Sequence, residues 1–137
     1  MNGASSAGGR ALILVVERDP HVRELEAYFL EEAGFDVEFA DDGEAAMQRA
    51  FDLKPEIVIT EILVPKLDGL ALCRRLKESD ELDGVRVLIF SILAAAGRAR
   101  EAGADAFLVK PLAEHTLVET VRRLIREDGA NRRGGAE

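Results

Sequence analysis

Short, mainly apolar runs alternate with amphipathic stretches along most of this chain. The apolar runs cover residues 11–16, 35–40, 57–62, 85–90 and 106–109. Each run has the length of a strand, and strands that are apolar on both faces are typical of a parallel sheet covered by helices on both sides. The pattern therefore predicts an α/β domain built on a doubly wound, five-stranded parallel sheet.

The segments between and after these runs predict five helices. The first begins at Asp19-Pro20, where Asp19 supplies an N-cap and Pro20 the first turn, and it ends near Gly34. Apolar residues at helical spacing define its expected buried face: Val22, Leu25, Phe29, Leu30 and Ala33. The other helices are expected to begin at residue 42, to cover 69–79, to lie just before residue 103 and to cover 114–127.

The length of the chain indicates one domain. Its 137 residues fit a single compact unit, because such units cluster near about 100–150 residues. We expect the domain to cover residues 11–128, with flexible tails rich in small residues at 1–10 and 129–137. No apolar run approaches the about 20 residues that span a bilayer, so no membrane anchor is predicted.

Charge and cysteine content narrow the class of partner. The chain has 18 Lys and Arg against 26 Asp and Glu, a net charge of −8. An acidic surface repels nucleic-acid phosphates and anionic lipid, so protein partners are expected instead.

The single cysteine, Cys73, forms no internal disulfide and is expected to be a small packing residue. With His21 and His115 it supplies too few ligands for zinc, and a reducing cytoplasm is the expected location.

Polar residues follow four of the predicted strands. They are Glu17-Arg18-Asp19, Glu61, Ser91 and Lys110. Ligands of doubly wound sheets bind at the carboxyl ends of the strands, so these residues form the candidate site. The first loop contains two carboxylates and no glycine, which argues against a nucleotide or flavin phosphate. An acidic cluster there suits a divalent cation, or a phosphoryl group held by Mg²⁺.

At these positions the sequence resembles the receiver domain of bacterial response regulators, over about residues 11–127. The resemblance rests on Glu17-Arg18-Asp19-Pro20, on residues 59–65 with Asp68-Gly69, on Phe90-Ser91 and on residues 103–111, which end in Lys110-Pro111. It implies a flavodoxin-like fold with strand order 2-1-3-4-5 and a role in two-component or phosphorelay signalling. In that family an acidic pair after the first strand helps to bind Mg²⁺, and an Asp ending the third strand accepts phosphate from a histidine kinase. A Ser or Thr, an aromatic residue and a Lys before a usually cis proline complete the switch.

The match is incomplete where the family performs its chemistry. Ser91, Phe107, Lys110 and Pro111 fit the switch and support positions, and Glu17 fits the first acidic position. Arg18, however, replaces the second acid, and Glu61 replaces the phosphoacceptor Asp. The extra methylene of Glu61 moves its carboxylate by about 1.5 Å. An error of about 1 Å can slow an in-line transfer about 100-fold.

These departures suggest a pocket that is neutralised from within. We hypothesise that Arg18 or Lys110 pairs with Glu17 and Glu61, so that Mg²⁺ binding is weak or absent and no metal or other cofactor is needed. Glu61 would then either imitate the phosphorylated state or serve only as a structural residue. The alternative is that Arg18 and Glu61 point to solvent. Asp19 is a further acid near the pocket, with helix capping as its expected role.

The fourth helix is expected to be about three residues shorter than in the family, close to one turn. The family uses the surface of its fourth helix, fifth strand and fifth helix to dimerise or to bind output partners. Here that face is expected to combine Phe107 with a locally basic set of side chains: Arg98, Arg100, Arg122 and Arg126. Expected partners are a histidine kinase, an output domain or a second copy of the chain.

Three functional hypotheses follow. The favoured one is an atypical receiver that works as a protein-interaction module, not as an enzyme, and independently of phosphorylation. The second is a working receiver phosphorylated at Glu61 or Asp19. The third, binding of a small ligand in a flavodoxin-like crevice, is disfavoured by the absence of a glycine loop.

Overall fold

A five-stranded parallel sheet forms the centre of the molecule. The computed structural model describes residues 9–136, with side chains up to Arg126. The sheet has the order β2-β1-β3-β4-β5, and every neighbouring pair of strands is parallel. The strands are β1 (Leu12–Val16), β2 (Asp36–Ala40), β3 (Ile57–Thr60), β4 (Arg86–Ser91) and β5 (Ala106–Val109). The predicted flavodoxin-like sheet is therefore confirmed.

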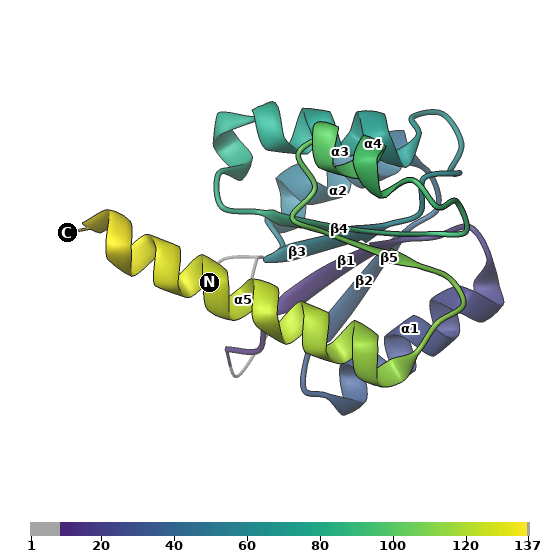
Figure 1. Cartoon of the computed structure of the whole chain (residues 1–137), viewed down its shortest axis with the longest axis horizontal. Helices are drawn as coiled ribbons and strands as arrows, with labels where there is room; N and C mark the ends of the chain where they lie inside the picture. Colours follow the sequence, from purple (N-terminus) through teal and green to yellow (C-terminus); the bar gives the residue numbers. More distant parts are fainter. Residues whose placement is uncertain (1–8, 137) are drawn as a thin grey trace.

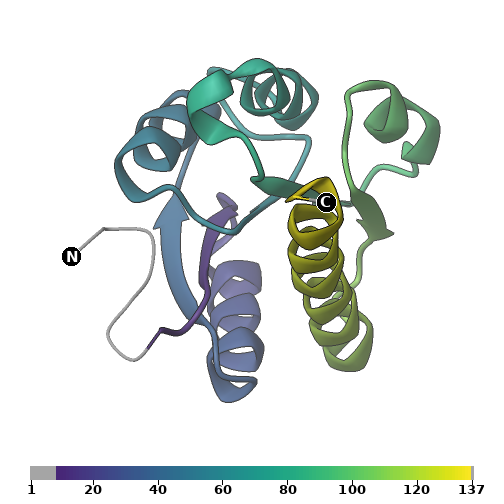
Figure 2. The same ribbon diagram turned by 90° about the vertical axis from the view of Figure 1, so that its left-hand side faces the viewer.

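Helices cover both faces of the sheet (Figures 1 and 2). One face carries α1 (Pro20–Glu32) and α5 (Glu114–Ala136), and the other carries α2 (Gly43–Leu53), α3 (Gly69–Glu78) and α4 (Ala96–Glu101). A 3-10 turn, Asp80–Leu82, links α3 to β4. The fourth helix, α4, is short, with six residues. No helix among the described residues is long and apolar enough to cross a membrane.

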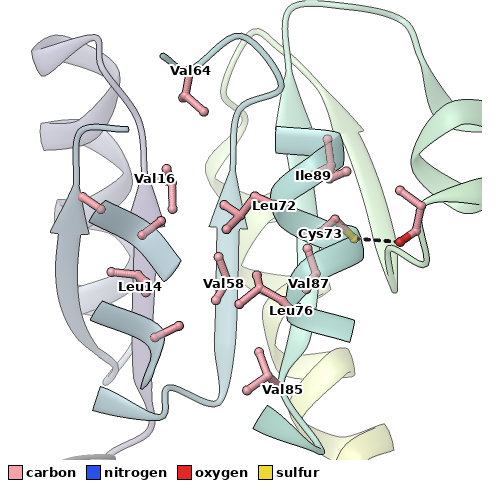
Figure 3. Packing of buried hydrophobic residues seen from close by; sticks show 14 of the residues in the cluster. Leu14, Val16, Val58, Val64, Leu72, Cys73, Leu76, Val85, Val87 and Ile89 are labelled. Carbon is pink, nitrogen blue, oxygen red and sulfur yellow. Dashed lines mark hydrogen bonds between the residues drawn. The ribbon is translucent and has the colours of Figure 1, made fainter. Parts of the chain in front are cut away.

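The sheet separates two hydrophobic clusters. Leu14, Val58 and Val87 pack under α2 and α3, whereas Ile13, Ile57 and Leu88 belong to the cluster on the α1 and α5 side. Neighbouring residues of a strand point to opposite faces, so burial of both faces explains the continuous apolar runs. Figure 3 shows the first cluster, in which the Cys73 Sγ lies 3.4 Å from the Ala102 carbonyl oxygen. Cys73 is buried, as expected of a packing residue, and burial raises the pKa of its thiol to about 11.

The buried stripe of α1 differs from the prediction. Asp19 caps the helix as expected, because its side chain accepts a hydrogen bond from the His21 amide. Leu25, however, is 49% exposed, whereas Glu26 is only 1% exposed. The core-facing line therefore passes through Glu26, four residues before the fully buried Leu30. The prediction that Leu25 belongs to the buried face is wrong.

The structure describes part of each expected tail. Residues 1–8 lie outside the described residues, and Arg10 already binds the fold, because its Nε donates to the Gly34 carbonyl oxygen at 3.0 Å. At the other end α5 continues to Ala136, through most of the segment expected to be a tail. A glycine in a helix interior costs only about 1 kcal/mol relative to alanine, so Gly129 does not by itself end the helix.

Two glycines allow loops to approach helix starts next to the site. A Cβ on Gly43 would lie 1.8 Å from the Leu67 carbonyl oxygen, and one on Gly69 would lie 2.3 Å from the Glu61 carbonyl oxygen. Asp68 caps α3 by accepting hydrogen bonds from the Leu70 and Ala71 amides. The backbone that carries Glu61 is thus fixed against the start of α3.

Candidate functional site

The carboxyl ends of four strands bring the predicted site residues together. Glu17 follows β1, Glu61 follows β3, Ser91 ends β4 and Lys110 follows β5. In the sheet order, β1, β3, β4 and β5 are successive neighbours, so their ends meet at one edge. Glu17, Glu61 and Ser91 are buried, and the Lys110 side chain is only 16% exposed.

Lys110 forms two ion pairs across this edge. Its Nζ lies 2.8 Å from Glu17 Oε1 and 3.0 Å from Glu61 Oε1. Burial alone would lower the pKa of Lys110, but hydrogen bonds and attraction to Glu17 and Glu61 outweigh burial and hold it above the ordinary value. One ammonium group therefore serves two buried carboxylates.

The Glu61 carboxylate is surrounded by hydrogen-bond donors. Its Oε2 accepts from the Ser91 hydroxyl and from the amides of Ile62 at 2.6 Å and Leu63 at 3.2 Å. Its Oε1 accepts from the Ile92 amide at 3.1 Å, in addition to Lys110. Burial would raise the pKa of Glu61, but these donors outweigh burial and lower it. Glu61 is thus an anchored, ionised residue and not a solvated strand end.

Arg18 and Asp19 lie beside this network and not in it. Arg18 is exposed, and of the two cations expected to pair with Glu17 and Glu61 only Lys110 is found there. The Asp19 side chain accepts from the His21 amide at 2.9 Å, while the Asp19 amide donates to Glu17 Oε2 at 3.1 Å. The hypothesis that Arg18 neutralises Glu61 is therefore corrected, because the turn at the start of α1 directs Asp19 to the helix cap and leaves Arg18 in solvent.

The carboxylate oxygens of the site do not fit the Mg²⁺ ion that the receiver family implies. Both Glu17 oxygens are engaged, Oε1 with Lys110 and Oε2 with the Asp19 amide. Both Glu61 oxygens are engaged as well. A hard cation needs several free oxygen ligands. Among the described residues no group of three or more His, Cys, Asp or Glu side chains is arranged to hold a metal.

The residues expected to act as switch and support lie in or directly after β4 and β5. Ser91 is fully buried and bonded to Glu61. Phe107 is half-buried and packs against the cluster under α2, α3 and α4. The bond between Lys110 and Pro111 is cis.

The basic residues expected on one interaction face are divided between two surfaces. Arg98 and Arg100 are exposed on α4, and Arg100 lines a hollow together with Phe107. Arg122 instead lines the groove between α1 and α5 and lies 3.8 Å from Glu119. Arg126 follows one helical turn later, on the same side of α5 as Arg122. The expectation of a single basic face is therefore corrected, because the helical repeat turns Arg122 toward α1.

Glu26 is a site residue that the sequence reasoning missed. It is buried on α1, and its charge interactions are with Glu17, Lys110 and Glu61. Its pKa is raised to about 8: burial is the largest cause, repulsion from Glu17 and Glu61 contributes, and attraction to Lys110 opposes the rise. The available signal was an acidic residue placed four residues after Val22 and four before Leu30.

Comparison with known proteins identifies a common family. The sequence model described as "Response regulator receiver domain" matches residues 13–122. The chain is 32% identical over 117 residues to the DNA-binding dual master transcriptional regulator RpaA of a Synechocystis strain, covering 83% of this chain and 48% of that protein. It is 36% identical over 122 residues to the gliding motility regulatory protein of Myxococcus xanthus, covering 86% of this chain and 16% of that protein. The chain thus spans half or less of the length of these two relatives.

Solved structures agree in fold. The receiver domain of a signal transduction histidine kinase from Syntrophus aciditrophicus superimposes with a TM-score of 0.80 at 34% identity, covering 85% of this chain and 91% of that chain. The chemotaxis response regulator CheY4 of Vibrio cholerae gives a TM-score of 0.78 at 24% identity, covering 84% of this chain and 98% of that chain, and supports the fold alone. The same five-stranded arrangement therefore occurs in both.

Proposed function

The chain belongs to the family of response regulator receiver domains, and from this premise we propose that it is a protein-interaction module that works without phosphorylation. Receiver domains are signalling modules that interact with histidine kinases and output domains. The finer proposal concerns this chain's pocket, in which Lys110 and Glu61 hold one arrangement that needs neither phosphate nor Mg²⁺.

The observation that carries the proposal is the saturated Glu61 carboxylate. Both oxygens accept hydrogen bonds inside the protein, and the side chain is only 5% exposed. An attacking carboxylate oxygen must reach the phosphorus in line, and an oxygen that already accepts hydrogen bonds would first have to release one of them. The longer side chain places the oxygens beyond the position of an aspartate, against Ser91 and Lys110.

A second candidate is a domain held permanently in the active arrangement. It is favoured by the contacts of Glu61, which reaches Ser91 and Lys110 at the same time. Phe107 is also packed inward, toward the cluster under α4. Under this proposal the Glu61 charge replaces that of a phosphorylated aspartate in orienting Ser91.

Exposed apolar side chains around the pocket support a role in protein binding. Leu63 is 52% exposed and Ile92 is 66% exposed, and the amides of both residues donate to Glu61. A partner that covers this rim would bury apolar surface over an anchored backbone. Candidate partners are a histidine kinase, an output domain or a second copy of the chain. The net charge of −8 disfavours direct contact with nucleic acid.

The experiment is phosphotransfer from acetyl phosphate in the presence of Mg²⁺, followed by intact-protein mass spectrometry. The chain should show no gain of a phosphoryl group. The matched control is the double variant Arg18→Asp with Glu61→Asp, which restores the acids of the family pattern and should gain the group. A stable phosphoryl adduct on Glu61 or Asp19 of the unaltered chain would instead establish a working receiver.

A second measurement separates the two candidates. Ser91→Ala removes the hydroxyl that Glu61 holds and leaves Lys110 in place. If the domain is permanently active, this variant should lose partner binding and shift the ring signals of Phe107. If the pocket is only structural, partner binding should remain within about twofold of the original.

A further inference from the structure

Glu26 places a carboxyl group inside the core below the site. It lies on α1, one turn before Leu30, and is 1% exposed. Its Oε1 is buried and has no hydrogen-bond partner. A buried charge without a partner is costly, so such a carboxyl group normally holds a proton.

Three charged groups at the sheet edge interact electrostatically with Glu26. Glu17 comes from the end of β1, Glu61 from the end of β3 and Lys110 from the end of β5. The titratable and charged residues that α5 brings to α1 line the groove beside Phe29 and Glu32: Glu114, His115, Glu119 and Arg122. The charged groups that shift the pKa of Glu26 are therefore those of the candidate site.

We propose that Glu26 is a proton-controlled element that determines whether Lys110 stays paired with Glu61. The inference rests on the proposed function, since it regulates the same Glu61 and Lys110 arrangement. With Glu26 neutral, one ammonium group serves two carboxylates. When Glu26 loses its proton, a third carboxylate attracts the same cation. Lys110 then moves away from Glu61, and the contact between Glu61 and Ser91 weakens.

The coupling works in both directions. If ionised Glu26 draws Lys110 away from Glu61, then Lys110 that stays paired with Glu61 must in turn favour the protonated form of Glu26. Burial and the two neighbouring carboxylates raise the pKa of Glu26 to about 8, and Lys110 is the one of its three charged neighbours that lowers it. Slightly alkaline conditions should therefore loosen the arrangement that neutral conditions hold.

The test is a titration of the full chain by NMR from pH 6 to 9.5. The side-chain carboxyl carbon of Glu26 reports its ionisation, and the methyl groups of Leu63 and Ile92 report the loops whose amides hold Glu61. Methyl signals survive high pH, at which exposed amide signals are lost. We expect the carboxyl and methyl signals to move together, with a midpoint near pH 8.

Two variants identify the titrating group. Glu26→Gln should abolish the methyl transition, whereas Glu24→Gln, an exposed residue of the same helix, should leave it unchanged. Lys110→Met should move the Glu26 midpoint to higher pH, because the attraction is lost. A methyl transition that persists in Glu26→Gln would overturn the proposal, and so would a Glu26 carboxyl that titrates without moving the methyl groups.

The result can be separated from the fate of the proposed function. Phosphotransfer is measured by mass spectrometry at one pH, and the titration uses no phosphodonor. A chain that accepts a phosphoryl group and still shows the coupled titration would refute phosphorylation-independent action alone. A chain that stays unphosphorylated and shows no coupled titration would refute the role of Glu26 alone.

Discussion

Replacement of Glu61 by glutamine keeps the size of the side chain and removes its charge. Every polar group around the carboxylate is a donor: the Ser91 hydroxyl, the Lys110 ammonium and three backbone amides. Glutamine has one oxygen and one amino group, and the amino group is itself a donor. In either orientation of the glutamine side chain, its amino group faces at least one buried donor, so Glu61→Gln cannot restore all the hydrogen bonds of the carboxylate.

The size of the effect follows from these contacts. An unsatisfied buried polar group costs about 1–3 kcal/mol, and removal of one partner from a buried ion pair costs about 3–5 kcal/mol. Lys110 keeps its second partner, Glu17, at 2.8 Å, which reduces the loss. We therefore expect Glu61→Gln to lower the free energy of unfolding by about 2–4 kcal/mol. At about 4 °C per kcal/mol for a domain of this size, the melting temperature should fall by about 8–16 °C.

The assay is urea unfolding at pH 7, followed by circular dichroism, with thermal unfolding as a second measure. The control is Glu38→Gln, because the Glu38 side chain is 47% exposed and pairs with Arg49 at the surface. Such a pair contributes about 0–1 kcal/mol, so this variant should remain close to the original chain. If Glu61→Gln unfolded within 0.5 kcal/mol of the original chain, Glu61 would not anchor the site, and the argument for a saturated pocket would fail.

Three further predictions concern residues around the site. The folded-state pKa of Glu26, about 8, lies above the reference value of 4.5. Between these two pH values the native state keeps a proton that the unfolded state releases, so the free energy of unfolding falls as the pH rises from 4.5 to about 8. Glu26→Leu should remove this pH dependence and raise the free energy of unfolding at pH 8.5 by on the order of 4 kcal/mol. Urea unfolding at several pH values measures the pH dependence, and an unchanged dependence in the variant would mean that another group causes it. Gly69→Ala should lower the free energy of unfolding by more than about 2 kcal/mol, because the added Cβ would lie 2.3 Å from the Glu61 carbonyl oxygen. At an unobstructed helix position the same change would instead stabilise the helix by about 1 kcal/mol. Arg18→Ala should change stability by less than about 0.5 kcal/mol in the same assay, and a larger loss would mean that Arg18 holds a partner in solution.

Much of the fold could be predicted because its signals are local. β1 is apolar at every position, and the Asp19-Pro20 pair starts α1 where expected. The parallel sheet then brings the strand ends together, so Glu61, Ser91 and Lys110 could be assigned to one site before their geometry was known.

The remaining details depend on side-chain directions that the sequence does not fix. Arg18 follows a buried strand, and the turn that follows decides whether it points inward or to solvent. To assign Glu26 to the buried face of α1, one would have had to predict that the neighbouring Leu25 is exposed, although leucine is usually buried. Tertiary packing overrides such preferences when the sheet edge above the helix is polar.

The shortness of α4 has a consequence for recognition. With six residues, one buried side chain at Ala99 and no side-chain cap at its start, this helix has little to keep it folded apart from its contact with the sheet edge. Local opening should therefore begin there, and its amides should be the first of any helix to exchange with solvent deuterium. A protein that binds this segment would have to order it, at a cost in binding free energy, and would need no covalent signal at the strand ends.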